Sequence, residues 1–108
     1  YNGPVYVRLG RAGVDDVTTE GYSFVPGKST ILVDGSDVTI IACGALVGPA
    51  VEASKTLSES NISARVINMA SIKPIDAEAI IKPLRKLVLS LQLKNIILLV
   101  ASVLLYLK

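Results

Sequence analysis

DVTIIACGALVGPAVEASKTLSESNISARVINMASIKPID, residues 37–76, contains the signals of a strand, a helix and a second strand in immediate succession. Residues 38–42 are apolar or β-branched without a break, which is typical of a strand buried on both faces of a sheet. After Gly44, apolar residues recur at helical spacing for about three turns, and Pro49 fits there only as a first-turn residue. Residues 62–67 favour a second strand. Because the connection is short, a right-handed parallel crossover is expected, and the fold class is α/β.

Shorter strands are predicted upstream of this unit, and a helix is predicted downstream. Residues 5–7 and residues 30–33 are mostly apolar or β-branched and are bounded by turn-forming residues. Residues 13–28 between them have no apolar period, which is typical of a linker. Asp76 is well placed to cap the following helix, and Pro83 is expected to disturb that helix.

The composition argues against several classes of function. The 108 residues carry a net charge of +2 with acids and bases interspersed, so there is no basic stripe of the kind that binds nucleic acids. The chain has no histidine and one cysteine, so a zinc site and a Cys–His dyad are not available. Cys43 lies in a predicted strand, where a small buried hydrophobe is expected. Because the chain starts at Tyr1 without a signal-peptide pattern, we expect a fragment of a longer, cytoplasmic protein.

Arg11 is the candidate functional side chain. It lies in a glycine-flanked loop directly after the strand predicted at residues 5–7. Open parallel sheets bind ligands at the carboxyl ends of their strands, and a guanidinium group there can hold a phosphate or carboxylate with two parallel hydrogen bonds. Taken by itself, an arginine in such a loop is more often a solvated surface charge than a ligand-binding group.

Three segments of the sequence resemble the C-terminal part of transketolase: GPVYVRLGRAGV (residues 3–14), DVTIIACGALVGPAVEASKTL (residues 37–57) and ISARVINMASIKPID (residues 62–76). The resemblance covers residues 3–82, and its nearest form is the split type, whose C-terminal subunit is a separate chain. Deoxyxylulose-phosphate synthases and 2-oxo acid dehydrogenase β subunits share this domain and remain alternatives. The resemblance implies a three-layer α/β domain with a mainly parallel sheet.

The resemblance also implies a domain organisation. Residues 1–12 would be the end of a pyrimidine-binding domain, residues 13–28 a linker, and residues 29–82 part of the C-terminal domain, followed by an aberrant apolar tail at residues 83–108. The parent enzyme would be dimeric, with its cofactor half in the same chain or in a separate N-terminal subunit.

The family reaction moves a two-carbon ketol unit between sugar phosphates on thiamine diphosphate with Mg²⁺, as in the pentose phosphate pathway. The family's cofactor-binding glycines, metal ligands and activating glutamate correspond to positions upstream of Tyr1. The resemblance therefore assigns no catalytic, cofactor-binding or metal-binding residue to this chain, which would bind neither cofactor and would be inactive alone. Arg11 matches the position of the family's contact to the substrate phosphate.

The tail at residues 83–108 has no counterpart in the family. A membrane anchor, and with it a small structural or interaction protein, is one interpretation, since residues 87–107 have the length of a bilayer span. Against it, Lys94 near the centre would cost about 2.5 to 3.5 kcal/mol. We favour a shifted reading frame, since permitted codons read from the third base of the Pro83 codon spell AKKTGAIVTAEEHNIIGGLGSAV, which resembles the family's continuation.

Loss of one nucleotide after the Lys82 codon would produce this tail. The sheet would then lack its next strand, and its apolar edge would be left open. Residues 84–93 could extend the helix that follows Asp76, and residues 96–107 could form a helix or a strand; the apolar pattern leaves both open.

Overall fold

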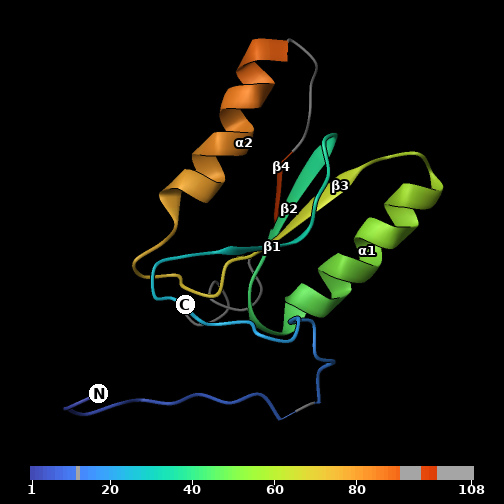
Figure 1. Ribbon diagram of the computed structural model, residues 1–108. Helices are drawn as coiled ribbons and strands as arrows, with labels where there is room; N and C mark the ends of the chain where they lie inside the picture. Colours follow the sequence, from blue (N-terminus) through green and yellow to red (C-terminus); the bar gives the residue numbers. More distant parts are fainter. Residues whose placement is uncertain (12, 91–95, 100–108) are drawn as a thin grey trace, which may run out of the picture.

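A single mixed sheet lies between two α-helices in the part of the chain that the structure, a computed structural model, describes: residues 1–11, 13–90 and 96–99 (Figure 1). The elements are β1 (Thr30–Val33), β2 (Val38–Ala42), the 3₁₀ helix η1 (Gly44–Leu46), α1 (Val47–Glu59), β3 (Ala64–Asn68), α2 (Ala77–Ser90) and β4 (Ile96–Leu99). The strand order is β1-β3-β2-β4.

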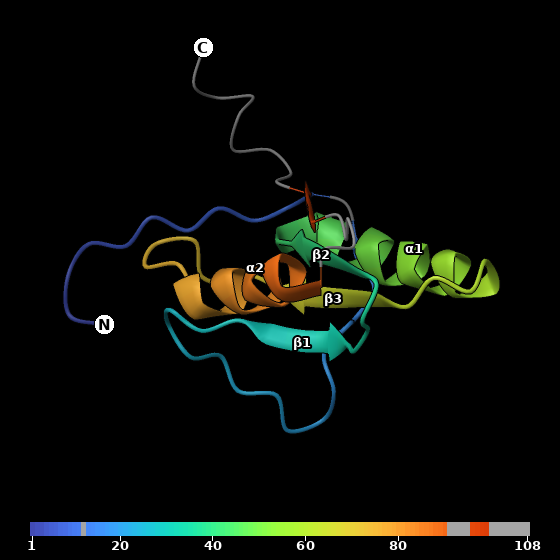
Figure 2. The ribbon, with the colours of Figure 1, turned by 90° about the horizontal axis from the view of Figure 1, so that it is seen from above.

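Parallel pairing dominates the sheet. β2 and β3 run parallel, from Val38 opposite Ala64 to Ala42 opposite Asn68, and β4 runs parallel to the other side of β2. β1 is antiparallel to β3 and lies at the outer edge of the sheet (Figure 2). The predicted strand–helix–strand unit is thus confirmed as β2–α1–β3, and the α/β class and the mainly parallel sheet are confirmed with it.

The core has two halves, one on each face of the sheet. Between the sheet and α1, one cluster of buried apolar residues consists of Ile40, Ala42, Val47, Ala50, Ala64 and Val66. The alternating residues Ile41 and Ile67 point to the other face, where they pack with Met69 and with Ala79 and Ile80 of α2. Because both faces of β2 and β3 are covered, these strands have apolar residues at successive positions.

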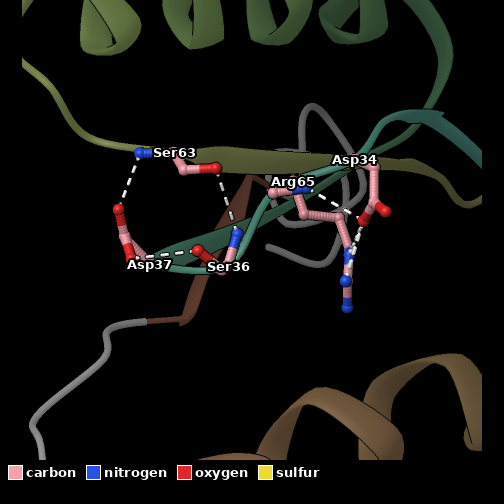
Figure 3. A network of polar contacts seen from close by, with 6 residues as sticks. Asp34, Ser36, Asp37, Ser63 and Arg65 are labelled. Atoms are coloured by element: carbon pink, nitrogen blue, oxygen red, sulfur yellow. Dashed lines mark hydrogen bonds and ion pairs between the residues drawn. The ribbon is translucent and has the colours of Figure 1, made fainter.

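The turn between β1 and β2 is bound to the start of β3 by a polar network (Figure 3). The backbone N–H of Ser63 donates to Asp37 Oδ2 at 2.8 Å, and the backbone N–H of Ser36 donates to Ser63 Oγ at 3.2 Å. Arg65 donates from Nε and Nη2 to Asp34 Oδ1 at 2.9 and 2.8 Å. These bonds fix the register in which β2 enters the sheet beside β3.

The strand predicted at residues 5–7 is absent. The segment runs extended but pairs with no strand of the described part of the chain, and Tyr6 is 89% exposed. An isolated strand cannot satisfy its backbone groups or bury its side chains, so local β propensity alone does not form one. Cys43 also differs from its prediction, since it follows β2 and is half-buried.

The predicted cap of α2 is confirmed. The backbone N–H of Ala79 donates to Asp76 Oδ1 at 3.3 Å, and the helix begins at Ala77. Pro83 does not end the helix, which runs through it to Ser90. Pro83 removes one N–H donor from the helix, which destabilises it. The packing of Ala79 and Ile80 against the sheet stabilises the turn before Pro83, and the helix continues.

The prediction that the apolar edge of β2 stays open is wrong. β4, from the tail, pairs with β2 from Thr39 opposite Ile96 to Ala42 opposite Leu99. Apolar and β-branched residues favour a strand whatever reading frame produced them, and β2 offers unpaired backbone groups. The remaining tail predictions, at residues 91–93 and 100–107, lie outside the described residues. Among the helices of the described residues, none is long and apolar enough to cross a membrane.

Candidate functional site

Arg11 lies in the N-terminal segment, which extends away from the sheet (Figure 1). The residue is exposed and forms a bend in the chain. Within residues 1–11, 13–90 and 96–99 the structure gives its guanidinium group no hydrogen bond or ion pair. Arg11 was the one candidate site residue of the sequence analysis, and neither an ion pair nor a hydrogen bond with another described residue holds it in place.

The chain returns to the domain at Val17. This side chain is half-buried and packs against the apolar cluster under α1. Its Cγ1 would lie 3.9 Å from a Cβ at Gly48, in the first turn of α1. The Val17 contact thus joins the predicted linker to the helix.

A local turn at Asp16 and Thr18 supports the Val17 contact. The backbone N–H of Thr18 donates to Asp16 Oδ1 at 3.0 Å, and the Thr18 hydroxyl donates to the same oxygen at 2.8 Å. The hydroxyl bond and then the backbone bond lower the pKa of Asp16 from its ordinary value. The packing of Val17 could not be predicted from the sequence, because a single valine among polar residues produces no apolar periodicity. The D-x-T spacing, which is typical of such side-chain turns, is the signal that could have identified the turn.

A hollow of about 600 Å³ lies between the linker and α1. It is lined by Gly13, Val14, Asp15, Asp16, Val17, Leu32, Ala45, Gly48, Pro49, Val51, Glu52 and Lys55. Lys55 donates to Glu52 Oε1 at 2.7 Å, and both side chains are largely exposed. The two opposite charges offset each other, so this solvent-exposed ion pair gives the hollow no net charge. The lining contains neither a nucleophile with an adjacent base nor a set of donors aimed at one point.

A smaller hollow of about 210 Å³ lies between the edge strand β1 and α2, and its lining includes Ser29, Ile31, Arg65, Asp76 and Lys82. Arg65 is already paired with Asp34, and Asp76 with Ser29, so the polar groups there hold the fold together. Neither hollow contains Arg11.

The described residues do not fit a thiamine diphosphate and Mg²⁺ site. Nowhere in that part of the chain do three or more His, Cys, Asp or Glu side chains gather so that they could hold a metal ion. Mg²⁺ requires carboxylate or carbonyl oxygens in octahedral geometry, and a diphosphate requires converging backbone N–H groups or cations. Arg11 is suited to a single phosphate group.

A known protein family matches most of the folded domain. Residues 27–92 match the family described as "Transketolase, C-terminal domain". The match covers β1 to α2 and continues past Lys82.

The similarity of the chain to individual proteins indicates the same family. Over 83 residues the chain is 53% identical to a subunit of the apulose-4-phosphate transketolase of Phocaeicola vulgatus, a match that covers 76% of this chain and 27% of that protein. It is 46% identical over 88 residues to 1-deoxy-D-xylulose-5-phosphate synthase of Heliobacterium modesticaldum, covering 80% of this chain and 14% of that enzyme. A solved structure titled "Split gene transketolase, inactive beta4 tetramer" superposes with a TM-score of 0.70 at 49% identity, over 77% of this chain and 28% of that one. The chain therefore spans about a quarter of the length of the transketolase chains that it matches.

Proposed function

The chain belongs to the transketolase C-terminal domain family, and we propose that it functions as part of an enzyme that moves a two-carbon ketol unit between sugar phosphates on thiamine diphosphate. One observation carries the proposal. The three-layer domain superposes on a split-gene transketolase chain with a TM-score of 0.70, at an identity of 49%. At 49% identity the two chains are similar in sequence as well as in fold. A shared role would preserve both.

In this proposal Arg11 holds the phosphate of the sugar substrate. The exposed guanidinium group can form two charge-assisted hydrogen bonds to phosphate oxygens. Its freedom from ion pairs within the described residues supports this role, because a paired arginine would first have to break its existing contact. The cofactor would bind to another part of the enzyme, since the described residues do not fit it.

Residues 1–12 would belong to a neighbouring cofactor-binding domain as its last strand. Val5, Tyr6, Val7 and Leu9 are all more than half exposed in this structure, although each is apolar or aromatic. Pairing in a second sheet would satisfy their backbone groups and bury those side chains. Residues 13–28 would then be the linker between the two domains.

A separate cofactor-binding subunit is the partner that fits best. The Phocaeicola vulgatus relative is itself one subunit of a transketolase, and the superposed chain is titled as an inactive tetramer of a split-gene enzyme. A polypeptide of this kind, inactive by itself, would assemble with its counterpart and with further copies in the cytoplasm.

Deoxyxylulose-phosphate synthase is the second candidate, because the Heliobacterium modesticaldum enzyme is 46% identical over 88 residues. The higher identity of 53% to a transketolase chain favours ketol transfer. Both reactions handle sugar phosphates, so the proposed role of Arg11 is the same in the two cases.

Activity of the complete enzyme tests the proposal. The domain, joined to its cofactor-binding portion, is supplied with thiamine diphosphate and Mg²⁺ and assayed for two reactions. We expect ketol transfer from a ketose phosphate to an aldose phosphate. Formation of 1-deoxy-D-xylulose 5-phosphate without ketol transfer would favour the second candidate, and the absence of both activities in a folded assembly would contradict the proposal.

A further inference from the structure

Four exposed apolar side chains lie beside one contact between the linker and the loop that follows β3. A Cβ at Gly27 would lie 3.2 Å from Pro74 Cγ, so the two segments lie side by side at this point (Figures 1 and 2). All four side chains are within three residues of the contact, which is at most about 11 Å of chain. Each is between 47% and 54% exposed, and together they are called the apolar patch: Phe24, Val25, Ile72 and Ile75.

Hydrogen bonds hold both sides of the apolar patch in shape. In the linker, the backbone N–H of Lys28 donates to the carbonyl oxygen of Val25 at 3.1 Å. This bond closes a turn in which Gly27 has a φ of 77°, a conformation that favours glycine. In the loop, the hydroxyl of Ser71 donates to the carbonyl oxygen of Pro74 at 2.8 Å. Both segments are therefore fixed before a partner arrives, which lowers the entropic cost of covering them.

The area of the apolar patch is too small to hold two separate chains together. Large apolar side chains bury roughly 150 to 250 Å² each when fully covered, so four half-exposed ones offer on the order of 400 Å². With an equal area on the partner, the contact would bury about 800 Å². Stable complexes between separate chains bury about 1,200 to 2,000 Å², whereas contacts between the domains of one chain bury about 600 to 1,500 Å². The area thus favours a second domain of the same chain over a second copy.

The linker provides the attachment that a contact of this size requires. Phe24 and Val25 belong to residues 13–28, which the proposed function places between this domain and the cofactor-binding domain. A domain attached at the far end of this linker remains near the apolar patch at a high effective concentration, so a small contact is enough to hold it. Covering Phe24 and Val25 also removes their apolar surface from water, which favours the contact.

We propose that the apolar patch is the docking surface for the cofactor-binding domain that contains residues 1–12. The inference rests on the two-domain organisation of the proposed function. It assigns the linker a second role, since its last part forms half of the surface that the other domain covers. The C-terminal domain would then fix the orientation of the cofactor-binding domain, although it contributes no side chain to the chemistry.

Hydrogen exchange in the complete enzyme tests the docking surface without depending on activity. Phe24→Gln makes the linker half of the apolar patch polar, and exchange is measured in the other half, at residues 71–76. We expect exchange there to become about ten-fold faster than in the parent enzyme, because the two domains separate. The radius of gyration from solution scattering should increase as well. Ile72→Gln, with exchange measured at residues 23–25, should give the same result.

Ile62→Gln is the matched control. Ile62 is also an exposed isoleucine, at 37%, but it precedes β3, whereas the apolar patch follows this strand. Phe24→Leu, which keeps a large apolar side chain, should retain the slow exchange of the parent enzyme. Should Phe24→Gln not fold, Val25→Thr makes the same comparison, because it keeps the shape of the side chain and adds a hydroxyl group.

Two results would overturn the inference. The first is an exchange rate and a radius of gyration in Phe24→Gln and Ile72→Gln that match those of Ile62→Gln. The second is slow exchange in the parent enzyme that is lost on dilution, because the apolar patch would then be covered by a separate chain. Ketol transfer is assayed independently on the same enzyme: docking without ketol transfer would contradict the proposed function and leave the docking surface standing.

Discussion

Asp76 and Ser29 are joined by two hydrogen bonds across 47 positions of the chain: Asp76 Oδ2 accepts from the backbone N–H of Ser29 at 2.9 Å and from its hydroxyl at 3.1 Å. The other carboxylate oxygen caps α2 at Ala79. One side chain thus connects the beginning of β1 to the beginning of α2. The pKa of Asp76 is lowered, chiefly by the backbone N–H of Ser29, against a smaller opposing effect of desolvation.

The lowered pKa predicts a pH dependence of stability. Because the folded pKa of Asp76 lies below the ordinary value of 3.8, its contribution is fully present at neutral pH and is lost as pH falls below about 4. We expect Asp76→Asn to lower the urea midpoint at pH 7 and to reduce the loss of stability between pH 7 and pH 3. Asp15→Asn, at an exposed position in the linker, is the control. A variant whose midpoint falls with pH as steeply as that of the parent chain would contradict this role.

Gly35→Ala should be strongly destabilising. A Cβ at Gly35 would overlap the backbone of Ala64 and Arg65 in β3, which cannot move without breaking the sheet. We expect the unfolding free energy to fall by about 1 to 3 kcal/mol or more in urea denaturation. Gly13→Ala is the matched control, because nothing lies within 4 Å of a Cβ there. Equal effects of the two substitutions would show that the β1–β2 turn is not packed as described.

The central part of the fold could be predicted because its sequence signal is local and repeated. Residues 38–42 are buried on both faces and apolar throughout, so pattern and structure agree. Residues 5–7 have the same local preference, but no neighbouring strand in the described part of the chain pairs with them, so they form no strand there. The contact of Val17 with α1 depends on one side chain meeting a distant helix. Apolar periodicity along the sequence carries no information about such a contact. Arg11 was identified only by its position after a predicted strand and by the resemblance to the family.

Sequencing of the DNA around the Lys82 codon tests the shifted reading frame directly. We expect one nucleotide to be missing there. Reinserting it should replace the strand at Ile96–Leu99 by one of the type GAIVTAEEH, with residues suited to pairing with β2 and to packing under the helices. If the frame is shifted, β4 has not been selected to pack in this sheet, so the repaired chain should unfold at a higher temperature than the present chain. A lower melting temperature of the repaired chain would mean that the tail is a genuine part of the fold.

The isolated chain should not bind thiamine diphosphate. The described residues hold no cluster of three His, Cys, Asp or Glu side chains for Mg²⁺, and the resemblance places the cofactor-binding groups in another part of the enzyme. Calorimetric titration with thiamine diphosphate and Mg²⁺ should give no binding heat beyond dilution, and ketose phosphates should not be converted. Binding at micromolar concentrations would require a cofactor site in this chain and would contradict the division of roles proposed here.

Substitution of Arg11 in the complete enzyme is the most direct test of the account. A charge-assisted contact to phosphate contributes about 1.5 to 3 kcal/mol, so Arg11→Ala should reduce kcat/KM for phosphorylated sugars roughly ten- to a hundred-fold and leave unphosphorylated sugars nearly unaffected. Arg8→Ala, which removes the same charge three positions earlier, is the control and should not produce this selectivity. A loss confined to phosphorylated substrates in Arg11→Ala is the predicted result. Equal losses for both kinds of sugar, or no loss at all, would contradict the assignment of Arg11 to the phosphate.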